Sequence, residues 1–383
     1  MKRSMLAGLA AAAALLPTLL APPAPVRADD TVTFGLIQPL TGQGAEVGQG
    51  IVKGIDLALD RINASGGVLG GKKLKYVLED DQCTPPVTVS AAKKLIGEEN
   101  LKIVMGAMCS STTLAIIPVT QAAKVLLVVP QSYHPQITER GDPYLFRTCI
   151  TSDGIADVYS DFIAHKQNVK TIALLGVNDD FGRAELAAFT QRFEKIGHPK
   201  VLMTEYFRFQ DRDFSTYLTR IREANPEAIY ILARTPQNAM IVNQMAEMRY
   251  KPRMFGNSNF TDQNFVDLTK GNAEGIYSIT DYSQFLDTPT NKAFFAAYRA
   301  KYNQDPSSDY ASAGYNAANA LAYAIEHAGT ATDVDKLAEA FHKAKVPINS
   351  GVETFDAHGQ GSILPFLVQL RGGVYYPLKA AAE

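Results

Sequence analysis

The sequence predicts an α/β fold built from two doubly wound parallel sheets. Apolar runs of strand length alternate with helical patterns along most of the 383 residues. These runs are almost continuously apolar, which is typical of parallel strands that helices bury on both faces. A pattern of strand, polar loop with glycine and helix also occurs twice, in "FGLIQPLTGQGAEVGQGI" and in "IALLGVNDDFGRAELAAF". The repeat indicates two domains of similar fold rather than one large sheet.

Ten apolar runs are candidate strands, and they fall into two series. The first series lies between about Asp30 and Thr148 and contains "TVTFGLI", "KLKYVLED", "KIVMGAM", "VLLVVP" and "YLFRTCI". The second lies between about Ser152 and Tyr277 and contains "TIALLGV", "VLMTEYF", "AIYILA", "RMFGN" and "GIYSI". Amphipathic segments separate most of these runs, so each series predicts repeated β–α units.

The helical segments and the tail complete the predicted organisation. Residues 46–65 carry four apolar residues on one face at helical spacing, namely Ile51, Ile55, Leu59 and Ile62. The helix-rich stretch from Pro289 to Ala344 must cover one of the two domains, so we expect the chain to cross between them more than once. The tail "PFLVQLRGGVYYPL" predicts a hairpin that turns at Gly372 and Gly373.

The N-terminal 28 residues have the pattern of a secretory signal peptide that is cleaved after Ala28. Lys2 and Arg3 precede an apolar stretch that three prolines interrupt and that is too short for a membrane span of about 20 residues. Without this segment, Lys and Arg fall from 37 to 34 against 39 Asp and Glu, a net charge of −5. This acidic balance excludes a nucleic-acid-binding protein with a basic face.

The three cysteines predict one disulfide and one free thiol in an oxidising compartment. Cys83 and Cys109 each follow a strand-like run, so both can lie at the same edge of a parallel sheet, and we expect them to pair. Cys149 lies within an apolar run and is expected to be a buried thiol rather than a nucleophile.

The first loop, "PLTGQGAEVGQG", resembles a phosphate-binding turn but lacks its chemistry. A P-loop requires Lys and Ser or Thr after its last glycine, whereas Gln49 and Gly50 follow Gly48 here. Val47 stands where a dinucleotide-binding loop has its third glycine, and Glu46 would repel phosphate. We interpret the loop as one edge of a ligand cleft.

Ligands of open α/β sheets bind beyond the carboxyl ends of the strands, where helices begin. This rule selects six loops as candidate cleft loops: Leu40–Gly48, Cys109–Thr113, Gln131–His134, Asn178–Gly182, Arg234–Gln237 and Asn257–Asp262.

The order and spacing of several stretches resemble the periplasmic leucine/isoleucine/valine-binding family, the substrate-binding proteins of ABC importers. The stretches are "INASGGVLGGKKLKYVLEDDQCTPPVTVSAAKKLI", "GAMCSSTT", "HPQITERGDPYLFRT", "GVNDDFGRA" and "DFSTYLTRI". The resemblance spans essentially the whole chain after the signal peptide and implies two lobes that three hinge strands join, the type I periplasmic binding fold. It places lobe 1 at residues 29–148 and 281–354, and lobe 2 at residues 149–280 and 355–383. It further implies a monomer in the periplasm that docks transiently on a membrane permease and holds a small carboxylate ligand, without a cofactor or a metal.

Family members hold the carboxylate of an amino acid at a helix start that resembles "CSST" here. Ser110 is therefore the first expected ligand contact, with Ser111 and Thr112 beside it, because a hydroxyl, free amides and the positive helix end favour an anion. The alternative for Ser110 is an ordinary helix N-cap. The resemblance adds seven further positions to the expected site: Val47, Gln131, Ser132, Tyr133, Phe181, Ser258 and Tyr310.

The largest departure from the family concerns the ligand's ammonium. Ser258 occupies the position of the glutamate that pairs with the ammonium in amino-acid binders. Either Asp262 replaces that charge, or the ligand has no ammonium; Asp262 is also placed to cap the following segment. Arg234 stands where the family has a neutral or aromatic residue, and it either binds a second carboxylate or pairs on the surface with an acid such as Glu205.

These features predict a solute-binding protein for an ABC importer. The ligand is a branched-chain or other amino acid, or, slightly favoured, an aromatic or dicarboxylic acid. The alternative is a periplasmic sensing module of the same fold. An enzyme is disfavoured because neither G-x-S-x-G nor H-E-x-x-H occurs, and only His134 lies in a predicted cleft loop as a candidate base.

Overall fold

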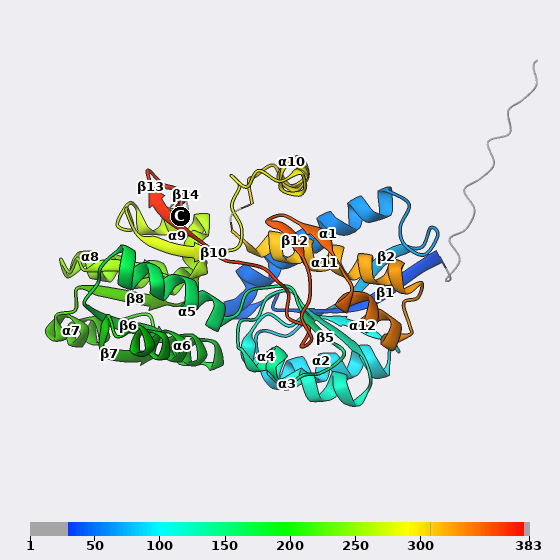
Figure 1. Cartoon of the computed structure of the whole chain (residues 1–383), viewed down its shortest axis with the longest axis horizontal. Helices are drawn as coiled ribbons and strands as arrows, with labels where there is room; N and C mark the ends of the chain where they lie inside the picture. Colours follow the sequence, from blue (N-terminus) through cyan, green and yellow to red (C-terminus); the bar gives the residue numbers. More distant parts are fainter. Residues whose placement is uncertain (1–29, 307, 379–383) are drawn as a thin grey trace, which may run out of the picture.

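The computed structural model describes residues 30–306 and 308–378. The predicted signal peptide, residues 1–28, lies outside the described residues. Within them, two mainly parallel sheets with helices on their faces form the two halves of the molecule, blue to cyan and green in Figure 1. The predicted α/β fold with two doubly wound sheets is confirmed.

The first sheet has the strand order β2-β1-β3-β4-β5, and all its neighbouring strands run parallel. Its strands are β1 (Thr31–Gln38), β2 (Lys73–Asp80), β3 (Ile103–Met105), β4 (Leu126–Val129) and β5 (Leu145–Arg147). Helices α1 (Ala45–Ala64), α2 (Pro85–Gly97), α3 (Ser110–Ala122) and α4 (Gln136–Glu139) connect them. The run "YLFRTCI" forms a shorter strand than predicted, because after Arg147 the chain leaves this sheet for the second one.

The second sheet has the order β14-β13-β10-β9-β8-β6-β7, in which only β13 and β14 are antiparallel to their neighbours. Its strands are β6 (Thr171–Val177), β7 (Lys200–Phe207), β8 (Ala228–Leu232), β9 (Arg253–Gly256), β10 (Tyr277–Thr280), β13 (Phe366–Arg371) and β14 (Val374–Pro377). Its helices are α5 (Ser152–Asp161), η3 (Phe162–Lys166), α6 (Asp180–Ile196), α7 (Ser215–Ala224), α8 (Thr235–Glu247), η4 (Ser258–Thr261) and α9 (Gln263–Thr269). Gly372 and Gly373, both at positive φ, form the two-residue turn between β13 and β14, as predicted.

The chain passes between the two sheets three times: after β5, after β10 and before β13. Between the second and third crossings, α10 (Pro289–Tyr302), α11 (Tyr310–Ala328), α12 (Val334–His342) and the hairpin of β11 (Val346–Ile348) and β12 (Gly351–Glu353) return to the first sheet. These helices, yellow to orange in Figure 1, lie over α1 and the first sheet.

Helices α1 and α11 form the closest helix pair of the first half. The four apolar residues predicted on one face of α1 are all buried. A Cβ on Gly54 would lie 1.9 Å from the Ala311 carbonyl oxygen, and one on Gly314 would lie 2.1 Å from that of Ile51. Only glycine permits this approach, so the two backbones pack directly against each other. The packing fixes the N-terminal end of α11 beside that of α1, at the boundary between the two halves.

Candidate functional site

A small cavity lies between the two halves, where several helices begin. It has a volume of about 30 Å³. Its lining residues are Val47, Met108, Cys109, Ser110, Gln131, Ser132, Tyr133, Phe181, Arg234 and Asn259. Each of the six loops selected from the sequence contributes at least one of these residues. The carboxyl ends of the strands therefore bring together loops that are far apart along the chain, as the rule for open sheets predicts.

Four helices begin at this small cavity. Val47 is the third residue of α1, Ser110 the first of α3, Phe181 the second of α6, and Arg234 the N-cap of α8. The first N–H groups of a helix have no acceptor within the helix, and the helix dipole adds a partial positive charge there. The cavity therefore offers an anion several N–H donors and a favourable potential.

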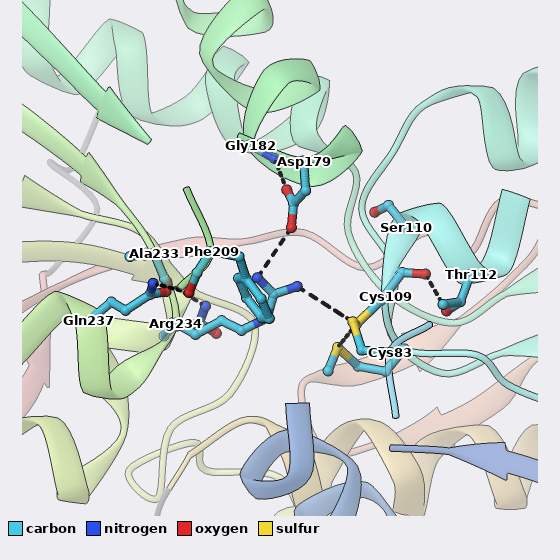
Figure 2. A network of polar contacts seen from close by, with 12 residues as sticks. Cys83, Cys109, Ser110, Thr112, Asp179, Gly182, Phe209, Ala233, Arg234 and Gln237 are labelled. Carbon is cyan, nitrogen blue, oxygen red and sulfur yellow. Dashed lines mark hydrogen bonds and ion pairs between the residues drawn. A yellow bond between two sulfur atoms is a disulfide. The ribbon is translucent and has the colours of Figure 1, made fainter. Parts of the chain in front are cut away.

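Arg234 is buried at the edge of this cavity, with 6% of its surface exposed. Its Nη1 atom lies 3.2 Å from Asp179 Oδ2, and its guanidinium lies over the Phe209 ring at 4.4 Å from the centroid. Its Nη2 atom lies 3.6 Å from Cys109 Sγ, across the boundary between the halves (Figure 2). The alternative of a surface pair with an acid such as Glu205 does not hold in that form: Arg234 does pair with an acid, but it is buried and the acid is Asp179. Strand β7 carries Glu205 to the outer edge of the sheet.

Glu205 instead accepts two hydrogen bonds from Arg220, at 2.8 and 2.7 Å. This outer ion pair is partly exposed, with 42% of the Arg220 side chain accessible. Glu205 thus pairs with the partly exposed Arg220, whereas Arg234 is buried at the cavity.

The disulfide joins Cys83 and Cys109, as predicted, with their Cα atoms 5.7 Å apart. Figure 2 shows its sulfur atoms facing the Arg234 guanidinium, next to the start of α3. The free cysteine, Cys149, is buried behind the cavity, and burial raises the pKa of its thiol to about 12. Its predicted character as a buried thiol is confirmed.

Tyr133 forms the aromatic centre of the small cavity. Its ring lies 5.7 Å from that of Phe181, at an angle of 57°. Its hydroxyl accepts a hydrogen bond from Gln131 Nε2 at 2.7 Å and lies 3.4 Å from both Ser258 Oγ and Asp309 Oδ2. Burial raises the pKa of Tyr133 well above 10, so the hydroxyl keeps its proton and donates to one of these oxygens.

Seven of the twelve predicted ligand residues line the small cavity, and five do not. Thr112 donates to the Cys109 carbonyl at 2.8 Å inside the first turn of α3, and Ser111 lies beside it on the same turn. Ser258 is not a lining residue, and its Oγ atom lies 3.4 Å from the Tyr133 hydroxyl. Asp262 caps α9 by accepting from Asn264 N at 2.7 Å, which is the capping role considered from the sequence. Tyr310 faces a second cavity.

That second cavity also lies between the two halves, on the other side of Tyr310 and Tyr133. Its volume is about 890 Å³. Residues of α1, of η4 and α9, of the second crossing, of the segment before α11 and of β13 and β14 line it. Contacts near the two cavities hold the halves together: Tyr310 donates to Asn259 Oδ1 at 2.9 Å, and Asn264 donates to the Glu46 carboxylate. Glu46 of the first loop therefore faces the opposite half.

Arg147 is a supporting residue that the sequence did not reveal. It is fully buried, and its guanidinium donates to the carbonyls of Ser132 and His134 at 3.0 and 2.8 Å. It also donates to Thr138 Oγ1 at 2.8 Å and to Gln360 Oε1 at 2.6 Å. Arg147 thus ties the loop that carries Tyr133 to the third crossing. Its place in the apolar run "YLFRTCI" was the available signal, because a buried arginine requires several acceptors.

Within residues 30–306 and 308–378, no three His, Cys, Asp or Glu side chains are grouped so that they could hold a metal ion. In the same described part of the chain, none of the helices has the length and apolar character that a bilayer crossing requires.

The sequence profile of one protein family, described as periplasmic binding protein, matches residues 31–373. The chain belongs to this family. A binding protein for leucine, isoleucine, valine, threonine and alanine from Pseudomonas aeruginosa is 30% identical over 341 residues, covering 89% of this chain and 90% of that protein.

Two solved structures share the fold of this periplasmic binding protein. A leucine-binding protein from Thermotoga maritima has a TM-score of 0.84 at 25% identity, over 91% of this chain and 98% of the other. A solute-binding protein of an ABC transporter from Rhodopseudomonas palustris, in complex with 3,4-dihydroxybenzoic acid, has a TM-score of 0.83 at 26% identity, over 92% and 98%. The resemblance found in the sequence is confirmed, and the chain is a solute-binding protein of this family.

Proposed function

We propose that this protein is the periplasmic substrate-binding component of an ABC importer and that it captures a small aromatic carboxylate at the small cavity. The observation that carries the proposal is the meeting of four helix N-termini around Ser110 and Arg234. The protein then acts as a monomer without catalysis. Its two lobes, at the boundaries predicted from the sequence, close over the ligand and present a surface to the permease.

A carboxylate at this site would have donors from both halves. The Ser110 hydroxyl and the first amides of α3 offer donors on one side. On the other side, Arg234 Nη2, whose hydrogen-bond contacts within the described residues are the two disulfide sulfurs, offers N–H groups. The rings of Tyr133 and Phe181 would lie against an aromatic ligand.

The same site offers little to an ammonium group. Ser258 supplies a hydroxyl where amino-acid binders have a carboxylate, and Gln131 Oε1 is a neutral acceptor. Gln131 Oε1 is buried and has no hydrogen-bond partner among the described residues. It suits a ligand hydroxyl, whereas a buried ammonium without a carboxylate partner costs several kcal/mol, on the order of 3–5.

The volume of the small cavity requires a change of arrangement when a ligand enters. About 30 Å³ is roughly the space of one water molecule. A benzoate therefore fits only if the halves separate or if Tyr133 and Phe181 move apart. Such an opening breaks the contacts of Tyr310 with Asn259 and of Asn264 with Glu46, and also that of Arg234 with Cys109.

Isothermal titration with leucine, phenylalanine, benzoate, 4-hydroxybenzoate and succinate tests the proposal. We expect 4-hydroxybenzoate to bind most tightly and to lose roughly 10- to 100-fold in affinity with Arg234→Gln, because a charge-assisted hydrogen bond contributes about 1.5–3 kcal/mol. Gln131→Met should weaken 4-hydroxybenzoate more than benzoate. Arg220→Gln, which removes the surface pair, is the matched control and should leave affinity unchanged. Tight leucine binding without 4-hydroxybenzoate binding would overturn the aromatic ligand and leave the importer role in place.

A further inference from the structure

The large cavity has no part in the proposed capture of a carboxylate, and its lining has the opposite chemical character. Three carboxylates line it, those of Glu46, Asp305 and Asp309, against one ammonium, that of Lys53. Asp305 is already paired with Arg299 at 2.9 Å, at the exposed rim. Asp309 is the acid that lies deepest, with 1% of its surface exposed.

Asp309 does not use its carboxylate to cap α11, although it lies at the start of that helix. It is the N-cap of α11, yet its side chain makes no capping hydrogen bond. Its Oδ2 atom lies 3.4 Å from the Tyr133 hydroxyl. Its Oδ1 atom is buried and has no hydrogen-bond partner among the described residues. Burial and the charges of Asp281 and Asp262 raise the pKa of Asp309 well above its usual value. Its unpartnered oxygen at the edge of the cavity is therefore unfavourable as a carboxylate unless a proton, a cation or a donor compensates it.

Tyrosines surround the same space. Tyr282, Tyr298, Tyr310 and Tyr375 line the large cavity. The hydroxyls of Tyr282 and Tyr375 are buried and also have no hydrogen-bond partner in the described part of the chain. Aromatic faces together with a carboxylate are the groups that recognise organic ammonium ions, through cation–π attraction and charge. A volume of about 890 Å³ is within the range of small-molecule sites.

We propose that the large cavity is a second ligand site, which takes a small organic ammonium ion with its nitrogen against Asp309 and the tyrosine rings. The ligand would contact both halves, because α1 and α11 belong to the first and α9, β13 and β14 to the second. It would occupy a place separate from the carboxylate site, with Tyr133 and Tyr310 between the two.

Titration calorimetry with choline and with putrescine tests this site on the full-length secreted protein. We expect at least one of the two probes to bind and Asp309→Asn to weaken it 10-fold or more. Glu46→Gln, on the opposite side of the cavity, should weaken it a few-fold. Asp305→Asn is the matched control and should change affinity less than 3-fold, because that carboxylate is already paired. Tyr282→Phe should distinguish the two probes. It should weaken the binding of putrescine, whose N–H groups need acceptors, and leave the binding of choline unchanged.

Two results would overturn the site. One is the failure of both probes to bind at millimolar concentration, and the other is binding that Asp309→Asn and Glu46→Gln leave unchanged. Circular dichroism of each variant shows whether it is folded, and Glu46→Gln provides a test on a second side chain. Ser110→Ala, titrated with 4-hydroxybenzoate and with the cation, distinguishes the two sites. It should weaken the aromatic acid and leave the cation unaffected, so failure at one cavity does not imply failure at the other.

Discussion

The two cavities between the halves differ in volume and in charge. The small cavity has a buried cation, Arg234, and four helix N-termini. Arg234 Nη1 pairs with Asp179, and its Nη2 faces the disulfide. The large cavity has a buried acid, Asp309, one of whose oxygens has no partner among the described residues. Tyr133 lies at the boundary, with its ring in the small cavity and its hydroxyl near Asp309.

One boundary between the two halves therefore holds a positive region at the small cavity and a negative region at the large cavity. Helix starts at the carboxyl ends of the parallel strands create the positive region. The negative region arises where crossings and returning helices, rather than strand ends, meet the second half. An anion and a cation would therefore be held by different parts of the fold.

We expect the largest effect from replacing Arg147, because this residue holds the loop that carries Tyr133 between the two cavities. Replacing it by Met leaves the carbonyls of Ser132 and His134 without their buried donor. We expect Arg147→Met to lower the free energy of unfolding by about 3–5 kcal/mol in urea denaturation.

Arg140→Met is the control for this prediction, because Arg140 is exposed and its guanidinium, within the described part of the chain, donates to Gln136 Oε1 at a long distance of 3.3 Å. It should change stability by about 0.5 kcal/mol or less. An equal effect of the two substitutions would show that Arg147 does not organise the loop.

Removing the disulfide tests the wall of the small cavity. The sequence separation of 26 residues predicts a loss of about 3 kcal/mol for the double substitution of Cys83 and Cys109 by Ser. Reduction of the unmodified protein by dithiothreitol should lower the free energy of unfolding by a similar amount. If the double variant keeps full stability but loses 4-hydroxybenzoate binding, the bond matters for placing Arg234 rather than for the fold.

Glu185 is a buried acid like Asp309, but it lies in the core of the second half. Burial raises its pKa to about 8, although Tyr230 donates a hydrogen bond to its Oε1 atom. The folded protein therefore holds a proton that the unfolded chain releases, so stability falls as pH rises toward 8 and then levels off. We expect Glu185 to contribute a fall of about 2 kcal/mol between about pH 6 and pH 8.

Glu185→Gln should remove this part of the pH dependence in denaturation curves measured at several pH values. Glu194→Gln, an exposed substitution on the same helix, should leave it in place. An unchanged slope in Glu185→Gln would mean that Glu185 is ionised in the folded protein.

We expect the smallest effect at Cys149, whose thiol reactivity tests the packing behind the small cavity. Its Sγ atom accepts a hydrogen bond from the Ser132 amide at 3.3 Å, and burial raises the pKa of the thiol to about 12. We expect negligible reaction with 5,5′-dithiobis(2-nitrobenzoate) at pH 8 until denaturant is added. Rapid labelling of the native protein would contradict the closed packing of the Tyr133 loop.

The sequence by itself determined the alternation of strands and helices, the glycine turn of the terminal hairpin and the pairing of Cys83 with Cys109. It also determined the six loops of the small cavity, because strand ends and helix starts are local features that parallel topology gathers at one edge. The tertiary structure alone decided the rest. It buried Arg234 beside Asp179 and gave Arg147 its acceptors. It also formed the large cavity, whose lining comes from segments that meet only when the chain has crossed between the sheets three times. Such contacts depend on long-range packing, which no local pattern of residues specifies.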